Sequence, residues 1–238
     1  GFGSPIDEAP FSCDGAIYQI AQFAGTTDNI STLYRLEPIA GVYNYTAVGR
    51  APMEGRLNSL AFNVQDGHMY INAGTDIVRI GNDGSWTNLG EPVDASDPSN
   101  VWSYGISNNG TIDGDGFYYM YIGAELIKID LNPVADGGRP TFEYLATMPY
   151  NVPFADMSYD PVTKMLYSVG TADNYLYTID LNDPSYPITY DLLDGPKLES
   201  SSGATLFNSF GELFVFDNVG LIYKVDIENL TMELFGAW

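Results

Sequence analysis

A short strand pattern recurs five times along the chain, and its clearest copy is Leu126-Ile127-Lys128-Ile129-Asp130. The other copies are Leu33-Tyr34-Arg35-Leu36-Glu37, Ile77-Val78-Arg79-Ile80, Leu176-Tyr177-Thr178-Ile179-Asp180 and Ile222-Tyr223-Lys224-Val225-Asp226. The last aliphatic residue of each copy stands at position 36, 80, 129, 179 or 225, so successive copies lie 44 to 50 residues apart. A chain of 238 residues holds five such steps, and one step is the length of a four-stranded propeller blade.

Each repeat carries its strands in one order. A short inner strand comes first and ends at an Asn or Asp, which can bond its own backbone and begin a tight turn. These inner strands are residues 60–63, 110–113, 157–160 and 205–208. A strand with an aromatic residue follows, then the repeated pattern, then an aromatic-rich strand at the rim. The order predicts an all-β fold, a five-bladed β-propeller of four-stranded antiparallel blades.

The whole chain, residues 1–238, is predicted to be one propeller domain. The predicted blades are residues 9–50, 57–92, 104–148, 153–193 and 202–238. The inner strand of the first blade is expected near residues 9–12, or else the N-terminal segment completes the last blade.

The composition favours strands and excludes several classes of protein. Gly 25, Pro 14 and Tyr 18 argue against long helices. Lys and Arg total 9 against 31 Asp and Glu, a net charge of −22, which excludes nucleic acid and anionic membranes as main partners. No apolar segment reaches the length of about 18 residues that a membrane span needs. One cysteine, Cys13, cannot form an internal disulfide, and one histidine, His68, cannot build a histidine-based metal site.

Several segments resemble a known family of repeat domains. They are PFSCDGAIYQI (10–20), LNSLAF (57–62), DGHMY (66–70), ADMSYDP (155–161) and FGELFVFDN (210–218). The resemblance is to secreted and cell-surface repeat domains that are carried in large extracellular proteins and are catalogued as a domain of unknown function. It covers nearly the whole chain, implies a propeller and an extracellular location, and implies no catalytic residue.

The densest group of oxygen ligands is Asp113-Gly114-Asp115-Gly116, preceded by Asn108-Asn109. Closely spaced Asp and Asn on a Gly-rich turn can supply several of the six to eight oxygens that Ca²⁺ takes. The full calcium-loop spacing with a Glu at its twelfth position is absent. Aligned with the other repeats, the segment is the hairpin between the first and second strands. Asp113 and Asp115 are therefore either turn formers or ligands of Ca²⁺, which is the one cofactor considered.

The inner strands are expected to line a central channel, where equivalent positions would face a ligand. Alignment on the residue that ends each inner strand gives a ring of Ser59, Asn109, Asp156 and Ala204. Asp156 is the one acid in this ring, whereas acid-base glycoside hydrolysis needs two carboxylates at a defined separation. We expect Asp156 to accept backbone N–H bonds from a neighbouring blade, and a channel-centred hydrolase is the alternative.

Four Asn-x-Ser/Thr sequences occur, and three of them are candidate N-glycosylation sites if the source is a eukaryote. These three are Asn29, Asn44 and Asn229, which are expected in a loop, on an outer strand and between the last two strands. The fourth, Asn109, is expected to carry no glycan because it falls on an inner strand.

Two classes of function fit these patterns. The first is a non-catalytic extracellular structural, adhesive or interaction module, part of a longer secreted or cell-surface protein, that binds a protein or glycan partner. The second is a lectin-like propeller that binds sugars in pockets between blades. Trp86 and Trp102 are the candidates to stack on sugar rings, and packing in the core or between blades is the alternative role for each. No Gly-x-Ser-x-Gly, phosphate-loop or His-Glu-x-x-His motif occurs. The chain is therefore predicted not to be an enzyme.

Overall fold

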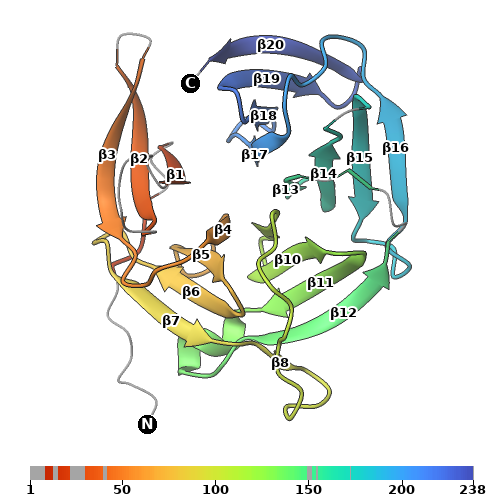
Figure 1. Cartoon of the computed structure of the whole chain (residues 1–238). Helices are drawn as coiled ribbons and strands as arrows, with labels where there is room; N and C mark the ends of the chain where they lie inside the picture. Colours follow the sequence, from red (N-terminus) through yellow and green to blue (C-terminus); the bar gives the residue numbers. More distant parts are fainter. Residues whose placement is uncertain are drawn as a thin grey trace.

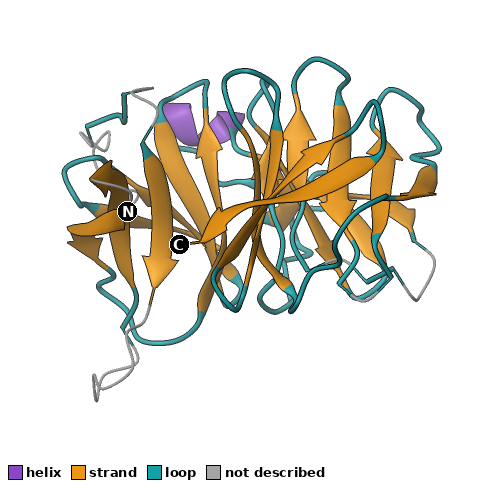
Figure 2. Ribbon diagram, turned by 90° about the horizontal axis from the view of Figure 1, so that it is seen from above, coloured by secondary structure: helices purple, strands orange, loops and turns teal. Residues whose placement is uncertain are grey.

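The computed structural model shows five small sheets arranged radially around a central axis (Figure 1). Figure 2 views the same ring from its edge, with the loops gathered at its two faces. The structure describes residues 9–12, 16–21, 30–39, 42–148, 152–153, 155–171 and 173–237. Cys13 and Asn29 lie outside the described residues. The five-bladed β-propeller predicted from the repeat is confirmed.

The blades are numbered here in chain order. Blade 1 contains β1 (Ile17–Ala21), β2 (Thr32–Ile39) and β3 (Val42–Arg50). Blade 2 contains β4 (Leu57–Asn63), β5 (His68–Ala73), β6 (Asp76–Ile80) and β7 (Trp86–Gly90). Blade 3 contains β8 (Val93–Asp94), β9 (Thr111–Ile112), β10 (Phe117–Ile122), β11 (Glu125–Asp130) and β12 (Thr141–Thr147).

Blades 4 and 5 complete the ring. Blade 4 contains β13 (Ser158–Asp160), β14 (Met165–Val169), β15 (Tyr175–Asp180) and β16 (Ile188–Leu192). Blade 5 contains β17 (Ser202–Phe207), β18 (Leu213–Asp217), β19 (Leu221–Asp226) and β20 (Thr231–Ala237). A short 3₁₀ helix, η1 (Asn132–Asp136), follows β11. In the described part of the chain, no helix is both long and apolar enough to cross a membrane.

The strands run from the channel to the rim in the predicted order. In blades 2, 4 and 5 the inner strand pairs with the aromatic strand, that strand pairs with the repeated pattern, and the rim strand comes last. All of these pairs are antiparallel. The two middle strands read as nearly continuous apolar runs because a neighbouring blade covers each of their faces, and β6 is buried at four of its five positions.

Four clusters of buried side chains hold neighbouring blades together. One joins Leu33 of blade 1 to Ile71 and Val78 of blade 2. The other three join blades 2 and 3, blades 3 and 4, and blades 4 and 5. Burial of apolar side chains between sheets is the main term that favours such a fold. The hydrophobic core is therefore divided into layers between the blades.

Blade 1 differs from the prediction of four strands, because its described residues form three. Residues 9–12 form no strand, so the expected inner strand from this segment was wrong. The segment instead lies on the turns of blade 2, where Phe11 N donates to Gly67 O at 2.6 Å and Asn82 N donates to Ala9 O at 2.8 Å. The Phe11 side chain is buried and packs edge-on against Tyr18, with ring centroids 5.0 Å apart.

Blade 3 differs in the other direction, because a fifth strand lies outside its rim strand. The strand β8 runs parallel to β12, with Val93 opposite Thr141. Two backbone bonds hold it, from Val93 N to Pro140 O at 3.1 Å and from Ala95 N to Phe142 O at 2.9 Å. The strand β8 covers the first two positions of β12, and this part of the edge is closed to pairing with another chain.

Candidate functional site

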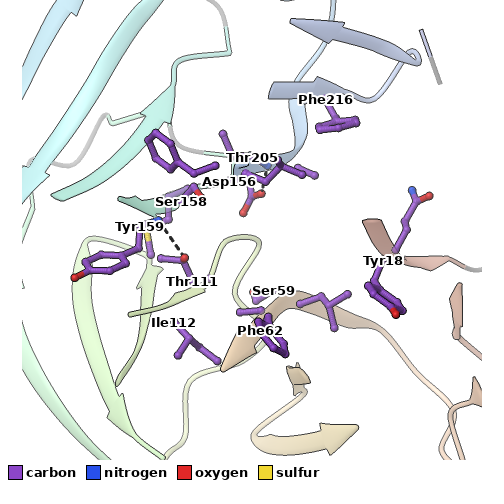
Figure 3. Close-up of a pocket in the computed structure, with 18 of the residues that line it drawn as sticks. Tyr18, Ser59, Phe62, Thr111, Ile112, Asp156, Ser158, Tyr159, Thr205 and Phe216 are labelled. Atoms are coloured by element: carbon purple, nitrogen blue, oxygen red, sulfur yellow. Dashed lines mark hydrogen bonds between the residues drawn. The ribbon is translucent and has the colours of Figure 1, made fainter. Parts of the chain in front are cut away.

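A cavity of about 530 Å³ lies where the inner parts of the blades converge (Figure 3). Its volume falls in the range that is usual for small-molecule sites. All five blades contribute to its lining, through Tyr18 of blade 1, Phe62 of blade 2, Thr111 of blade 3, Tyr159 of blade 4 and Phe216 of blade 5. The ring arrangement therefore gathers residues that lie far apart in the sequence into one site.

Asp156 provides a carboxylate to this cavity. It precedes β13, and its Oδ2 accepts the backbone N–H of Thr205 on blade 5 at 2.6 Å. Burial raises the pKa of Asp156 from its ordinary value of 3.8 to about 7, and backbone N–H bonds from Met157, Thr205 and Gly110 oppose that rise. Thr205 and Gly110 belong to the two neighbouring blades, so the expected backbone bonds to Asp156 are present.

Side chains also link the other inner strands. Ser59 Oγ of blade 2 donates to Ser107 O at 2.9 Å and to Asn109 O at 3.0 Å, both in the segment that leads into blade 3. Tyr118 of blade 3 donates its hydroxyl hydrogen to Ser59 O. Thr111 Oγ1 of blade 3 accepts the backbone N–H of Tyr159 in blade 4 at 3.1 Å, as drawn in Figure 3. A chain of polar links therefore joins blades 2 to 5 around the cavity.

Three of the four positions in the expected channel-facing ring lie at the cavity. Ser59, Asp156 and Ala204 line the cavity, whereas Asn109 does not. The Asn109 amide is buried and turned back onto β10, where Oδ1 accepts Tyr121 N at 2.8 Å and Nδ2 donates to Tyr121 O at 3.2 Å. Asn109 is therefore held by its own blade and does not line the cavity.

A β-bulge alters the inner strand of blade 2 at one of the predicted ring positions. The register between β4 and β5 shifts between Asn58 and Ala61, and Ser59 within this shift has φ of 65°. An extra residue in one strand reorients the side chains around it. Ser59 still lines the cavity, so the bulge changes the local register without removing this predicted position.

Asp113, one of the two predicted calcium ligands, is committed to its own hairpin. Its Oδ1 accepts the backbone N–H groups of Asp115 and Phe117, each at 2.9 Å, and its Oδ2 accepts the Tyr119 hydroxyl at 3.1 Å. Asp115 is exposed, and its backbone oxygen accepts Asn132 Nδ2 at 3.1 Å. Among the described residues, no group of three or more His, Cys, Asp or Glu is placed to hold a metal ion. The hairpin interpretation accounts for Asp113, and the calcium site stays a prediction.

The turn chemistry at the end of each inner strand is confirmed. In blades 2 to 5 an Asn or Asp stands at the end of the inner strand or directly after it, and its side-chain Oδ1 accepts the backbone N–H two residues later. The four bonds are Asn63 with Gln65, Asp113 with Asp115, Asp160 with Val162, and Asn208 with Phe210. Asn and Asp therefore recur there because their short side chains can close such turns.

Two of the candidate glycosylation sites are exposed. Asn44 lies on β3, the rim strand of blade 1. Asn229 lies in the turn between β19 and β20, where its Nδ2 donates to Asp226 Oδ2 at 2.8 Å. Glycosylation itself stays a prediction.

The aromatic residues of the site were missed by the sequence prediction. Tyr18, Phe62 and Phe216 lie around the same space in Figure 3 and are each only partly buried. The alternation of side chains along β1, β4 and β18 could have indicated them, once the facing of each strand was known. Trp102, which was predicted as a sugar-stacking residue, is 1% exposed and packs against Phe142 in the core. Trp86 is partly buried on β7 and packs against the cluster between blades 1 and 2.

Comparison with known proteins identifies a sequence family. A family described as a repeat of unknown function (DUF6923) matches residues 20–234. No curated protein matches the chain.

Solved structures of other proteins share the fold. A chain of the crystal structure of a nidogen/laminin complex is 14% identical, with a TM-score of 0.53 over 93% of this chain and 94% of that chain. A streptogramin B lyase is 13% identical, with a TM-score of 0.52 over 99% of this chain and 72% of that chain. A protein of unknown function from Bacteroides caccae is 14% identical, with a TM-score of 0.53 over 92% of this chain and 73% of that chain. At these identities the likeness is one of fold alone.

Proposed function

Starting from the fact that the chain belongs to the DUF6923 repeat family, we propose that it is a non-catalytic binding module whose recognition site is the cavity among the inner strands. The observation that carries the proposal is the cavity itself, which measures about 530 Å³ and is lined by residues of all five blades. Recognition sites for small ligands are typically concave, mostly apolar and furnished with few polar groups.

The chemistry of the lining supports binding without catalysis. Its acidic side chains are Asp113 and Asp156, and both oxygens of Asp113 already accept hydrogen bonds from its own blade. The described lining contains no His, Cys, Lys or Arg. Glycoside hydrolysis would need two available carboxylates, and nucleophilic catalysis would need a base beside a nucleophile.

We place this module in an extracellular setting, as part of a longer secreted or surface protein. The support is the net charge of −22, which keeps it away from nucleic acid and anionic membranes, and the two exposed Asn-x-Thr sites at Asn44 and Asn229. The similar solved structures share only the fold, so neither laminin binding nor lyase chemistry is carried over to this chain.

The test is a fragment screen by ligand-observed NMR on the full chain and on two matched variants. Leu206→Trp places a larger side chain at the lining, whereas Leu192→Trp places one on the exposed rim strand β16. We expect fragments to bind the native protein and Leu192→Trp, and to lose about tenfold or more in affinity for Leu206→Trp. Equal binding to a folded Leu206→Trp would place the recognition site elsewhere and end the proposal.

A second candidate function is glycan binding at the rim, and one aromatic cluster favours it. Tyr190 is 63% exposed and lies against Tyr175 and Tyr177, with ring centroids 5.3 and 5.9 Å away. Exposed aromatic faces stack on apolar sugar faces. A glycan array on native protein and Tyr190→Ala tests this candidate, which requires binding by the native protein and its loss in the variant.

A further inference from the structure

The two charged side chains of the described cavity lining, Asp113 and Asp156, are both acidic. Asp156 reaches into the cavity from the segment before β13, and Figure 3 shows its carboxylate facing the central space. The hydrogen-bond partners of this carboxylate include the backbone N–H groups of Thr205, Met157 and Gly110, which are neutral dipoles. The described lining has no Lys, Arg or His to balance the charge. Asp156 is partly exposed at the cavity, and an ionised carboxylate that is shielded from water without a cation costs free energy, so a bound cation would be stabilised here.

The aromatic lining has the second property that a cation site needs. Tyr18, Phe62 and Phe216 come from three different blades and surround the same space as Asp156 in Figure 3. All three residues are partly exposed, and Tyr18 also packs edge-on against Phe11. An aromatic face attracts an organic cation through its quadrupole, most strongly where water is excluded.

The remaining lining residues indicate that the bound cation has an apolar part. Leu57, Leu60, Ile17 and Leu206 add aliphatic surface to the same cavity. A small inorganic ion would leave this surface unpaired, and an anion would be repelled by Asp156. The site fits a molecule of a few carbon atoms or more that carries one positive nitrogen.

We propose that the cavity binds an organic ammonium ion, with the nitrogen beside Asp156 and the apolar body against Tyr18, Phe62 and Phe216. This inference rests on the proposed function, because it takes the cavity as the recognition site. The same chemistry has two sources, a free organic amine or the side chain of a lysine on a partner protein.

Three probes with the same ring and different charge test the proposal by calorimetry. They are benzylammonium, benzyl alcohol and benzoate, titrated into the full chain at about pH 8, where a carboxyl with a pKa of about 7 is mostly ionised. We expect benzylammonium to bind about tenfold more tightly than benzyl alcohol, and benzoate to bind more weakly than both. Equal affinity for benzylammonium and benzyl alcohol would overturn the proposal.

Two charge-matched variants separate the local carboxylate from the general negative charge. Asp156→Asn removes the charge in the cavity, and Asp191→Asn removes one from the exposed rim strand β16. The preference for benzylammonium should vanish in Asp156→Asn, with benzyl alcohol still bound, and persist in Asp191→Asn. A preference that falls equally in both variants would assign it to net charge and overturn the proposal.

The outcomes also separate failure of the ammonium inference from failure of the proposed function, binding in the cavity. If Leu206→Trp blocks benzyl alcohol but charge makes no difference, the cavity is a binding site and only the ammonium inference fails. If no probe binds the folded native protein, both fail. N-acetyl-lysinamide, titrated in parallel, separates the two sources, because binding comparable to benzylammonium indicates a lysine side chain and much weaker binding indicates a free amine.

Discussion

Tyr119 on β10 donates its hydroxyl hydrogen to Asp113 Oδ2 at 3.1 Å, and both side chains are 7% exposed. The same arrangement recurs in blade 5, where the Tyr223 hydroxyl donates to Asp217 Oδ2 at 3.5 Å. In both pairs the other carboxylate oxygen holds backbone N–H groups of a turn. The tyrosine therefore ties a hairpin turn to the strand that follows it, and this explains a recurring Asp and a recurring Tyr without any ligand.

The substitution Tyr119→Phe removes the hydroxyl that donates to Asp113 Oδ2. The free energy of unfolding should fall by about 1–2 kcal/mol, because this buried carboxylate oxygen then loses its tyrosine donor. Urea denaturation measures the change. Tyr190→Phe on the exposed rim strand is the control and should have almost no effect. Equal losses in the two variants would show that the Asp113 bond contributes nothing.

Asp113 should not contribute to any rise in melting temperature on addition of Ca²⁺. The two carboxylate oxygens of Asp113 already accept hydrogen bonds from three protein donors. Thermal melts with calcium and with a chelator measure this. An ion that binds the folded state adds about 2.7 kcal/mol at a hundredfold excess over its Kd. A rise of that size that disappears in Asp115→Ala would establish the predicted calcium site.

The contribution of Asp156 to the free energy of unfolding should decrease as the pH rises from about 4 to about 7. Burial raises the pKa of this carboxyl from 3.8 to about 7, so the folded protein holds a proton that the unfolded chain has lost. Unfolding free energy then decreases with pH in this window, by at most about 1.4 kcal/mol per pH unit, and levels off above it.

Urea denaturation at several pH values, with Asp156→Asn beside the native protein, isolates this contribution. The variant should lose the downward slope, and Asp191→Asn on the rim should keep it. An unchanged slope in Asp156→Asn would mean that other groups carry the pH dependence.

A methyl group at Gly49 should separate blades 1 and 2. A Cβ built on Gly49 would lie 2.5 Å from the carbonyl oxygen of Gly84 and 2.6 Å from its Cα, so backbone would have to move. Overpacking of this kind costs about 1–3 kcal/mol. Denaturation of Gly49→Ala measures the cost, and Gly236→Ala, where a Cβ would meet nothing within 4 Å, is the control. A Gly49→Ala variant as stable as the control would show that this approach is not tight.

Features that repeat with the blade could be predicted from the sequence, and features that break the repeat could not. The order of strands and the turn role of Asn63 or Asn208 follow from local patterns that each blade copies. The strand β8 could not be predicted. Val93 pairs with Thr141, which lies 48 residues later in the sequence, and the two strands share only two paired positions. Pairing of so few residues leaves no period in the sequence.

The candidate site was predicted less completely than the fold. Asp156 was found because a lone acid stands out among small and polar residues at the inner ends of the blades. Phe62 and Phe216 were missed because aromatic residues are more often buried in a core, and their exposure depends on how the blades are angled. The outward turn of Asn109 from the cavity depends on hydrogen bonds to Tyr121, which only the three-dimensional register reveals.

The described strands of each blade all come from one continuous stretch of chain, and residues 9–12 lie against blade 2 rather than in the sheet of blade 5. Under mechanical tension, blade 5 has no described strand that comes from the N-terminal part of the chain and must be pulled out before the rest can yield. We therefore expect blade 5 to unfold first, beginning at its outer strand β20 and proceeding inward, while blades 2 to 4 stay packed. Extension under load would then come in steps of one repeat, each about 160 Å at roughly 3.4 Å per extended residue.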